Sequence, residues 1–240
     1  MPSVAALIIG NEILTGKVQE TNVALLAREL FARGVDLRRV VVCRDDVRVI
    51  AEDLNDLRRR HDWVVTSGGV GPTHDDVTLA AVARAFGRAL VRSRELEEMI
   101  RRLVGDRLEE GHLRMSVVPD GAELVTCPGV TWPVVLVDNV FVMPGLPKVF
   151  RVELPAVCER IGASTPFLSR AIFTLCRETE IAPLLDRIVA EHTTVEIGSY
   201  PVTDEDYRVR LTFDGIDPEA IDRAVDALLA ALPHEKIVQR

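Results

Sequence analysis

The first 87 residues alternate three times between an apolar, strand-like run and an amphipathic helical pattern, and this alternation constrains the fold most. The strand-like runs are 4–9, 35–43 and 63–65, and the helical patterns cover about 21–33, 47–60 and 77–86. Repeated strand–helix units favour a right-handed, doubly wound and mostly parallel sheet. Ligands of such sheets bind outside the carboxyl ends of the strands. We therefore predict an α/β domain with its site at that edge.

Each of the first two helices is predicted to bury one apolar stripe. Thr21 or Asn22 is expected to cap the first helix, with Gly34 as its stop. Gly87 is expected to end the third. The predicted inner stripes are Leu25, Leu26, Leu30 and Phe31 in the first helix, and Val49, Ile50, Leu54 and Leu57 in the second.

A glycine-rich stretch, residues 66–78, stands where the third strand hands over to the third helix. Gly68, Gly69 and Gly71 allow backbone amides to approach a ligand closely and to converge on an anion. No Lys follows these glycines, so the stretch is not a Walker loop. Asp75 and Asp76 follow instead, and two carboxylates beside a phosphate cradle require a cation between them.

Two further polar segments are predicted to lie at the same edge of the sheet. Residues 10–16 follow the first strand as a loop, and Asp45-Asp46 follow the second. Their convergence with residues 68–76 indicates one ligand site. A simpler interpretation of the glycine-rich stretch also stands: a tight turn in which Thr73 and Asp76 form a helix capping box.

Residues 67–78, Ser-Gly-Gly-Val-Gly-Pro-Thr-His-Asp-Asp-Val-Thr, closely resemble the signature of the molybdopterin-binding superfamily. This group includes the MogA and MoaB proteins, the first domain of CinA (competence/damage-inducible) proteins and the first module of animal FAD synthases. Residues 10–16, the pair Asp45-Asp46 and residues 143–147 match in order. Residues 198–201 and 207–212 are similar to the second part of CinA-like and FAD-synthase modules. One departure is Asn11, where the family usually has Asp.

The resemblance implies a ligand with a flat ring and one or two phosphates. Two chemistries follow: metal-dependent hydrolysis of a nucleotide diphosphate such as ADP-ribose or FAD (a nucleotide pyrophosphatase), or molybdopterin binding and adenylylation in molybdenum cofactor biosynthesis. Asp45 and Asp76 are the candidate catalytic residues and ligands of Mg²⁺ or a similar ion. The other candidate ligand-binding residues are Gly10, Glu12, Gly68, Gly69, Gly71, Pro72, Thr73, Asp75, Thr78, Gly145 and Pro147.

An alternative function is a non-catalytic module that binds a nucleotide or pterin and regulates a partner. Asn11 favours it, because a weakened metal site can bind a ligand without turning it over. These 240 residues include neither the deamidase domain often attached to CinA proteins nor the adenylyltransferase domain of FAD synthases. We therefore expect those two activities to be absent.

Residues 162–166 are the predicted linker between domain 1–161 and domain 167–240. The second domain reads strand, helix, strand, strand, helix, strand, which predicts a small α+β βαββαβ unit. Arg208 and Arg210 share one strand face, where they reach an anion or form a solvated surface. Late in the first domain we expect a hairpin over 133–143, and Trp132 beside it either stacks on a ligand ring or packs in the core.

Composition limits the partners. A net charge of −8 leaves no basic face for nucleic acid, and no apolar run approaches the ~20 residues that span a membrane. Four scattered cysteines without Cys-x-x-Cys spacing are typical of buried free thiols in a reducing cytoplasm. We expect a cytoplasmic homo-oligomer, a dimer or trimer, whose partner is a small-molecule nucleotide or pterin.

Overall fold

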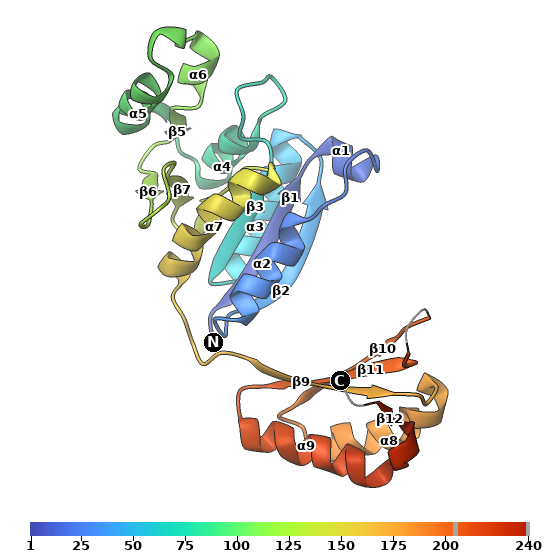
Figure 1. Cartoon of the computed structure of the whole chain (residues 1–240). Helices are drawn as coiled ribbons and strands as arrows, with labels where there is room; N and C mark the ends of the chain where they lie inside the picture. The colour runs from blue at the N-terminus through green and yellow to red at the C-terminus, as the bar shows by residue number, and fades with distance from the viewer. Residues whose placement is uncertain (204–205, 239–240) are drawn as a thin grey trace. The chain divides into compact units, whose positions relative to one another are not determined.

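The computed structural model describes residues 1–203 and 206–238. The chain divides into two compact units, Met1–Ser164 and Thr165–Arg240 (Figure 1). The first unit is an α/β domain built on a mostly parallel sheet, and the second is a smaller α+β domain. The predicted fold class is confirmed in both.

The six-stranded sheet of the first unit has the order β2-β1-β3-β8-β7-β6. Its strands are β1 (Ser3–Ile9), β2 (Asp36–Cys43), β3 (Trp63–Ser67), β6 (Glu123–Val125), β7 (Val134–Val137) and β8 (Val140–Val142). β1 pairs in parallel with β2 and β3, and β3 with β8, whereas β7 forms the predicted hairpin with β8. In this order β2 lies on one side of β1 and β3 lies on the other. The carboxyl ends of β1 and β3 therefore form the switch point at which ligands bind in such sheets.

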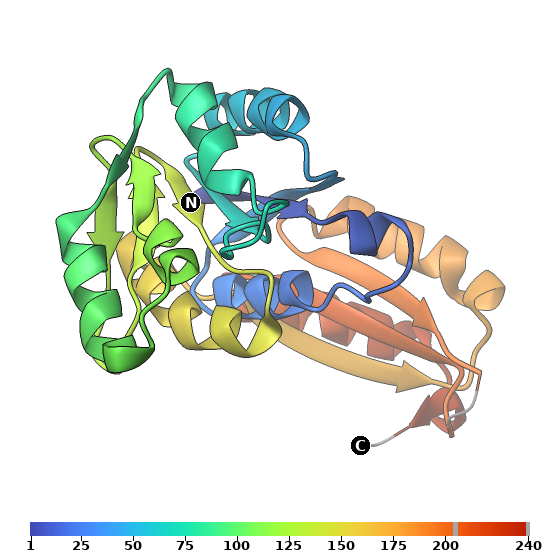
Figure 2. The same ribbon diagram turned by 90° about the horizontal axis from the view of Figure 1, so that it is seen from above.

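Strand β1 shows why helices cover both faces of this sheet. Its side chains are buried on both sides, with Ala6 and Ile8 in one core cluster and Leu7 and Ile9 in the other. Helices α2 (Asn22–Phe31) and α7 (Pro147–Ile161) cover the first face, and α3 (Val47–Arg60) and α4 (Thr78–Phe86) cover the second (Figure 2). A strand buried on both faces in this way reads as a continuous apolar run.

The predicted inner stripes are wrong at two positions, Phe31 and Val49. Phe31 is 38% exposed and Val49 is 39% exposed, whereas their neighbours Leu30 and Ile50 are fully buried. One residue turns a helix by about 100°, so a residue next to the stripe can leave the core.

The predicted loop 10–16 also differs from the structure, because it contains a short helix, α1 (Asn11–Leu14). Between α4 and β6 the chain forms a smaller subregion. Its elements are β4 (Leu90–Arg92), α5 (Arg94–Val104), η1 (Gly105–Arg107), α6 (Glu110–Arg114) and β5 (Val117–Pro119).

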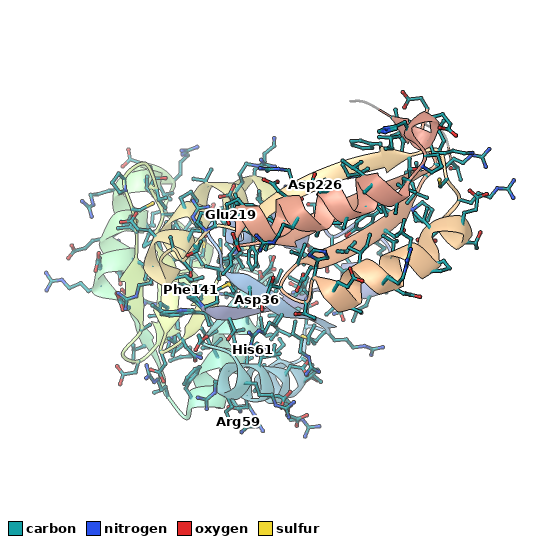
Figure 3. The ribbon with its side chains drawn as sticks, turned by 90° about the horizontal axis from the view of Figure 1, so that it is seen from below. Asp36, Arg59, His61, Phe141, Glu219 and Asp226 are labelled. Carbon is teal, nitrogen blue, oxygen red and sulfur yellow. The ribbon has the colours of Figure 1, made fainter. Side chains whose placement is uncertain are left out.

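The basic end of α3 is occupied by local contacts. Arg58 lies over the Phe86 ring at 4.3 Å from its centroid, and Arg60 pairs with Asp56 at 2.9 Å. Figure 3 shows Arg59 on this helix and Phe141 within the same unit, where it is fully buried. Cations in the last turn of α3 also complement the helix dipole.

The second unit has the predicted order of elements. These are β9 (Leu168–Thr174), α8 (Glu178–Glu191), β10 (Glu196–Pro201), β11 (Val209–Gly215), α9 (Pro218–Ala231), η2 (His234–Lys236) and β12 (Ile237–Val238). The antiparallel sheet has the order β10-β11-β9-β12, and Leu211 and Phe213 form its core with both helices. Arg208 and Arg210 are exposed.

Two expectations from composition can be compared with the structure. Cys43, Cys158 and Cys176 are buried free thiols, and Cys127 is a half-buried one. Burial raises the pKa of the Cys43 thiol to about 12 and that of Cys158 to about 11. None of the helices in the described part of the chain is long and apolar enough to cross a membrane.

Candidate functional site

Gly68 joins the ends of three strands. Its N–H donates to the Met143 carbonyl at 3.1 Å, just beyond β8. Its φ is +111°, and a Cβ there would overlap the carbonyl oxygen of Ile9 at the end of β1. Only glycine therefore fits this close approach. Gly145 also packs tightly against this residue, since a Cβ at position 145 would lie 3.2 Å from the Gly68 Cα.

The first residue of α4, Thr78, forms two hydrogen bonds to the backbone of the glycine loop. Thr78 is fully buried, its hydroxyl donates to the Gly68 carbonyl at 2.8 Å, and its N–H donates to the Gly69 carbonyl at 3.0 Å. In a trans peptide the N–H points opposite to the C=O. The amides of Gly69 and Val70 are therefore directed away from Thr78.

The amides of Gly69, Val70 and Gly71 are free donors. Within residues 1–203 and 206–238 no hydrogen-bond acceptor is recorded for any of the three. All three residues line a cavity of about 590 Å³. A run of unpaired amides beside the N-terminus of a helix is suited to an anion.

The cavity lies in the first unit and gathers seven of the predicted site residues. These are Glu12, Gly68, Gly69, Gly71, Asp76, Gly145 and Pro147. They come from the segments that follow β1, β3 and β8, whereas Asp45 and Asp46 after β2, which were predicted to converge on the same site, do not line the cavity. The predicted residues outside the lining are Gly10, Asp45, Pro72, Thr73, Asp75 and Thr78. Of these, Thr78 acts on the loop from inside the fold, and the Gly10 N–H donates to the Cys43 carbonyl at 3.2 Å.

Asp76 stabilises the loop and faces the cavity. Its Oδ2 accepts hydrogen bonds from the N–H of Thr73, at 2.8 Å, and from the Thr73 hydroxyl. No helix begins at Thr73, because α4 begins at Thr78. The capping-box interpretation is therefore wrong. The pair closes a turn instead, and the second oxygen of Asp76 has no recorded partner in the described chain.

The two acids after β2 have different roles. Asp46 is the N-cap of α3: its side chain accepts from the amides of Val49 and Arg48, which lowers its pKa. The Asp45 Oδ2 accepts the N–H of Asn11 at 2.8 Å, which ties the loop after β2 to α1. Asp45 is half-buried, and its Oδ1 has no recorded partner among the described residues.

A metal ion would find few protein ligands here. In the described ranges, no group of three or more His, Cys, Asp or Glu side chains is placed to hold one. Asp45 and Asp76 each offer one free oxygen. Of the two, only Asp76 lines the cavity, and an ion such as Mg²⁺ is commonly held by one or two carboxylates and completed by phosphate oxygens and water.

Sequence reasoning missed Asn22 as a loop-positioning residue. It is 2% exposed, and its Nδ2 donates to the Ser67 hydroxyl and the Gly145 carbonyl, both at 2.9 Å. It was predicted as a possible helix cap, but the cap position is Thr21, which makes no side-chain bond. Asn22 instead joins the loops after β3 and β8.

Glu153 on α7 was also missed. It is 3% exposed and lines the cavity. Its signal in the sequence is a carboxylic acid inside an apolar stripe, three residues after Phe150 and four before Val157. Trp132 also lines the cavity and is half-buried, so it is placed for either predicted role.

The fold and these loops define a class: a doubly wound α/β protein with a cavity at the carboxyl edge of its sheet. Residues 5–163 match the family described as a probable molybdopterin binding domain, and the chain belongs to this family. Residues 166–240 match the middle domain of FAD synthase. The resemblance stated from the sequence motifs is thus confirmed.

Similar proteins cover either the whole chain or its first unit. A protein of Archaeoglobus fulgidus is 36% identical over 217 residues, which is 90% of this chain and 92% of that one. A probable FAD synthase of Caenorhabditis elegans is 29% identical over 93% of this chain, which spans about half (49%) of that protein. The crystal structure of CinA from Thermoplasma acidophilum, 30% identical, superposes with a TM-score of 0.61 over 67% of this chain and 98% of that chain.

Proposed function

We propose that the cavity binds a nucleotide or pterin through its phosphate groups, and that the protein hydrolyses the phosphoanhydride of a nucleotide diphosphate of the ADP-ribose or FAD type. The observation that carries this proposal is the row of three amides without acceptors, Gly69 to Gly71, on the cavity wall. Their N–H groups would donate hydrogen bonds to phosphate oxygens, and the N-terminus of α4 would favour the negative charge of the phosphate.

The charge of the cavity supports a metal-dependent reaction. Among the described residues its lining includes the acids Glu12 and Asp76, but no Lys, Arg or His. A diphosphate entering this site gains nothing from basic side chains and is repelled by ionised acids. A divalent cation would offset that repulsion.

Asp45 and Asp76 would hold the cation. When bound, an ion such as Mg²⁺ neutralises the negative charge that develops on the phosphate in the transition state. The residues of the chain supply position: the loop amides orient the phosphates, and Asp76 is fixed by its bonds to Thr73. The same loop would also serve adenylylation of molybdopterin, the second chemistry that the family resemblance implies.

A non-catalytic binding module is the second candidate. It is favoured by the small number of carboxylates available and by Asn11, whose side chain carries no charge where the family usually has Asp. In that case the amides would still bind the phosphates.

One assay separates the candidates. The purified chain is incubated with ADP-ribose or FAD, with Mg²⁺ or with a chelator, and release of the nucleoside monophosphate is followed. Metal-dependent release supports hydrolysis. Binding by calorimetry without release assigns the module, and neither release nor binding with these nucleotides or with a pterin overturns the site.

We also propose a homo-oligomer, a dimer or trimer, in the cytoplasm. Strand β2 is at the edge of the sheet and exposes Val40 (41%) and Val42 (39%), a surface that a second copy would cover. The four free thiols fit a reducing compartment. Light scattering of the purified chain measures the oligomeric state.

A further inference from the structure

Glu153 occupies a core position of α7. The inner stripe of this helix contains Phe150, Leu154 and Val157, each no more than 2% exposed. Glu153 is 3% exposed within the same stripe and borders the cavity. A carboxyl group at such a position loses its hydration, which costs stability unless a partner replaces the water.

The chain supplies no such partner. Over residues 1–203 and 206–238, no hydrogen bond or ion pair of Glu153 is recorded, and Asn22 Oδ1 is the one side-chain atom found both fully enclosed and unpaired. Burial raises the pKa of Glu153 to about 8, so the carboxyl is mostly neutral at pH 7. A neutral acid offers one O–H donor and one carbonyl acceptor.

Much of the lining of the cavity that Glu153 borders is apolar. The lining residues of this kind include Trp132, Pro133, Val135, Val142 and Val149. An apolar cavity with one polar group is suited to a flat heterocycle, whose faces contact hydrocarbon while one edge forms hydrogen bonds. The free amides of Gly69, Val70 and Gly71 line the same cavity, so ring and phosphate of one ligand can be bound together.

We infer that the Glu153 carboxyl binds the ring of the ligand by pairing with an edge that carries one N–H donor beside one acceptor. The pair is two hydrogen bonds: the acid O–H donates to the ring acceptor, and its carbonyl accepts the ring N–H. Flavin, pterin and purine rings all present such an edge. The inference rests on the proposed function, because it names the ring-binding group of that site.

The test uses two variants of nearly equal shape. Glu153→Gln keeps one donor and one acceptor in its amide, whereas Glu153→Leu keeps the volume and loses both. Affinities are measured by calorimetry without added metal for FAD, ADP-ribose and neopterin. Ribose 5-phosphate, which has a phosphate but no heterocycle, is the matched control ligand.

We expect Glu153→Leu to bind at least one of the three ring-bearing probes about 10–100-fold more weakly than wild type, the loss of two neutral hydrogen bonds. Glu153→Gln should stay within about threefold. Ribose 5-phosphate affinity should be equal in all three proteins.

Three outcomes overturn the inference. Unchanged affinity of a folded Glu153→Leu variant shows that the ring lies elsewhere. A loss with Glu153→Gln as large as with Glu153→Leu shows that an ionised carboxylate, not a neutral acid, is required. Equal losses for ribose 5-phosphate show a general distortion of the cavity. A wild-type protein that binds none of the four probes fails at an earlier step and rejects the proposed function itself.

Discussion

The hydroxyl of Thr78 donates to the carbonyl of Gly68 at 2.8 Å, across the turn that joins β3 to α4. This bond, with the one from the Thr78 N–H to the Gly69 carbonyl, directs two carbonyls inward and leaves the following amides free. The first residue of a helix therefore determines the shape of the proposed phosphate site without lining it.

Thr78→Val should weaken both the fold and ligand binding. The variant leaves the buried Gly68 carbonyl without its donor, so we expect the free energy of unfolding to fall by about 1–3 kcal/mol. ADP-ribose affinity should fall about tenfold, or 1.4 kcal/mol, as the amides lose their orientation. Thr78→Ser is the control: it loses a buried methyl, at about 1 kcal/mol, but keeps the hydroxyl and the affinity. Equal affinities in the two variants would show that the bond does not orient the loop.

Gly68→Ala should cost more stability than Gly87→Ala. Both glycines have positive φ, +111° and +64°, so both substitutions introduce backbone strain. A Cβ at Gly87 meets no atom within 4 Å, whereas one at Gly68 overlaps the Ile9 carbonyl oxygen. We expect Gly68→Ala to lower the free energy of unfolding by about 1–3 kcal/mol more than Gly87→Ala in urea titrations. Equal losses would contradict the close approach of β1 and β3.

The pH dependence of stability should change in Glu153→Gln. The folded pKa of Glu153, about 8, is above the ordinary value of 4.5, so the folded state holds this proton more tightly than the unfolded chain. Its contribution is fully present below pH 4.5 and is lost as pH rises towards 8. Wild type should lose about 3 kcal/mol more than Glu153→Gln between pH 5 and pH 8. Parallel profiles would show that this carboxyl is well solvated.

Limited proteolysis should cleave first within residues 162–166. The boundary between the two compact units falls after Ser164, and residues 163, 165 and 166 are exposed. We expect two fragments that resist further digestion, identified by mass spectrometry. Early cleavage inside residues 1–155 would place the least stable segment in the α/β domain instead.

The alternation of strands and helices could be predicted because it depends on the local spacing of apolar residues along the sequence. Helix α3 begins and ends at the predicted residues, since a clear apolar stripe and an N-terminal cap mark it. Which amides of the glycine loop are free could not be predicted: the Gly68 N–H, expected to face an anion, donates to the Met143 carbonyl instead. The free amides depend on Thr78 and on the approach of Gly145 to Gly68, contacts between segments far apart in sequence.

The errors follow from the same distinction. The sequence pattern identifies the apolar face of a helix but not the limits of that face. Phe31 and Val49 were therefore assigned to the buried face although each lies just outside it. Glu153 went unnoticed because a single acid in an apolar stripe resembles a surface residue. Its place in the lining of a cavity is visible only in the structure.

Asp76 is proposed to hold a cation against the ligand's phosphates, and a comparison of three Asp→Asn variants tests this role. Asp76→Asn removes the charge but keeps an oxygen for Thr73, and Asp46→Asn removes an exposed charge after β2 while keeping a good helix cap. Asp45→Asn should behave as Asp76→Asn does. Metal-dependent hydrolysis of ADP-ribose should fall by about 10²–10³ in Asp76→Asn, with the unfolding midpoint nearly unchanged, and stay at the wild-type rate in Asp46→Asn. Wild-type hydrolysis by Asp76→Asn, or an equal loss in Asp46→Asn, would contradict the account.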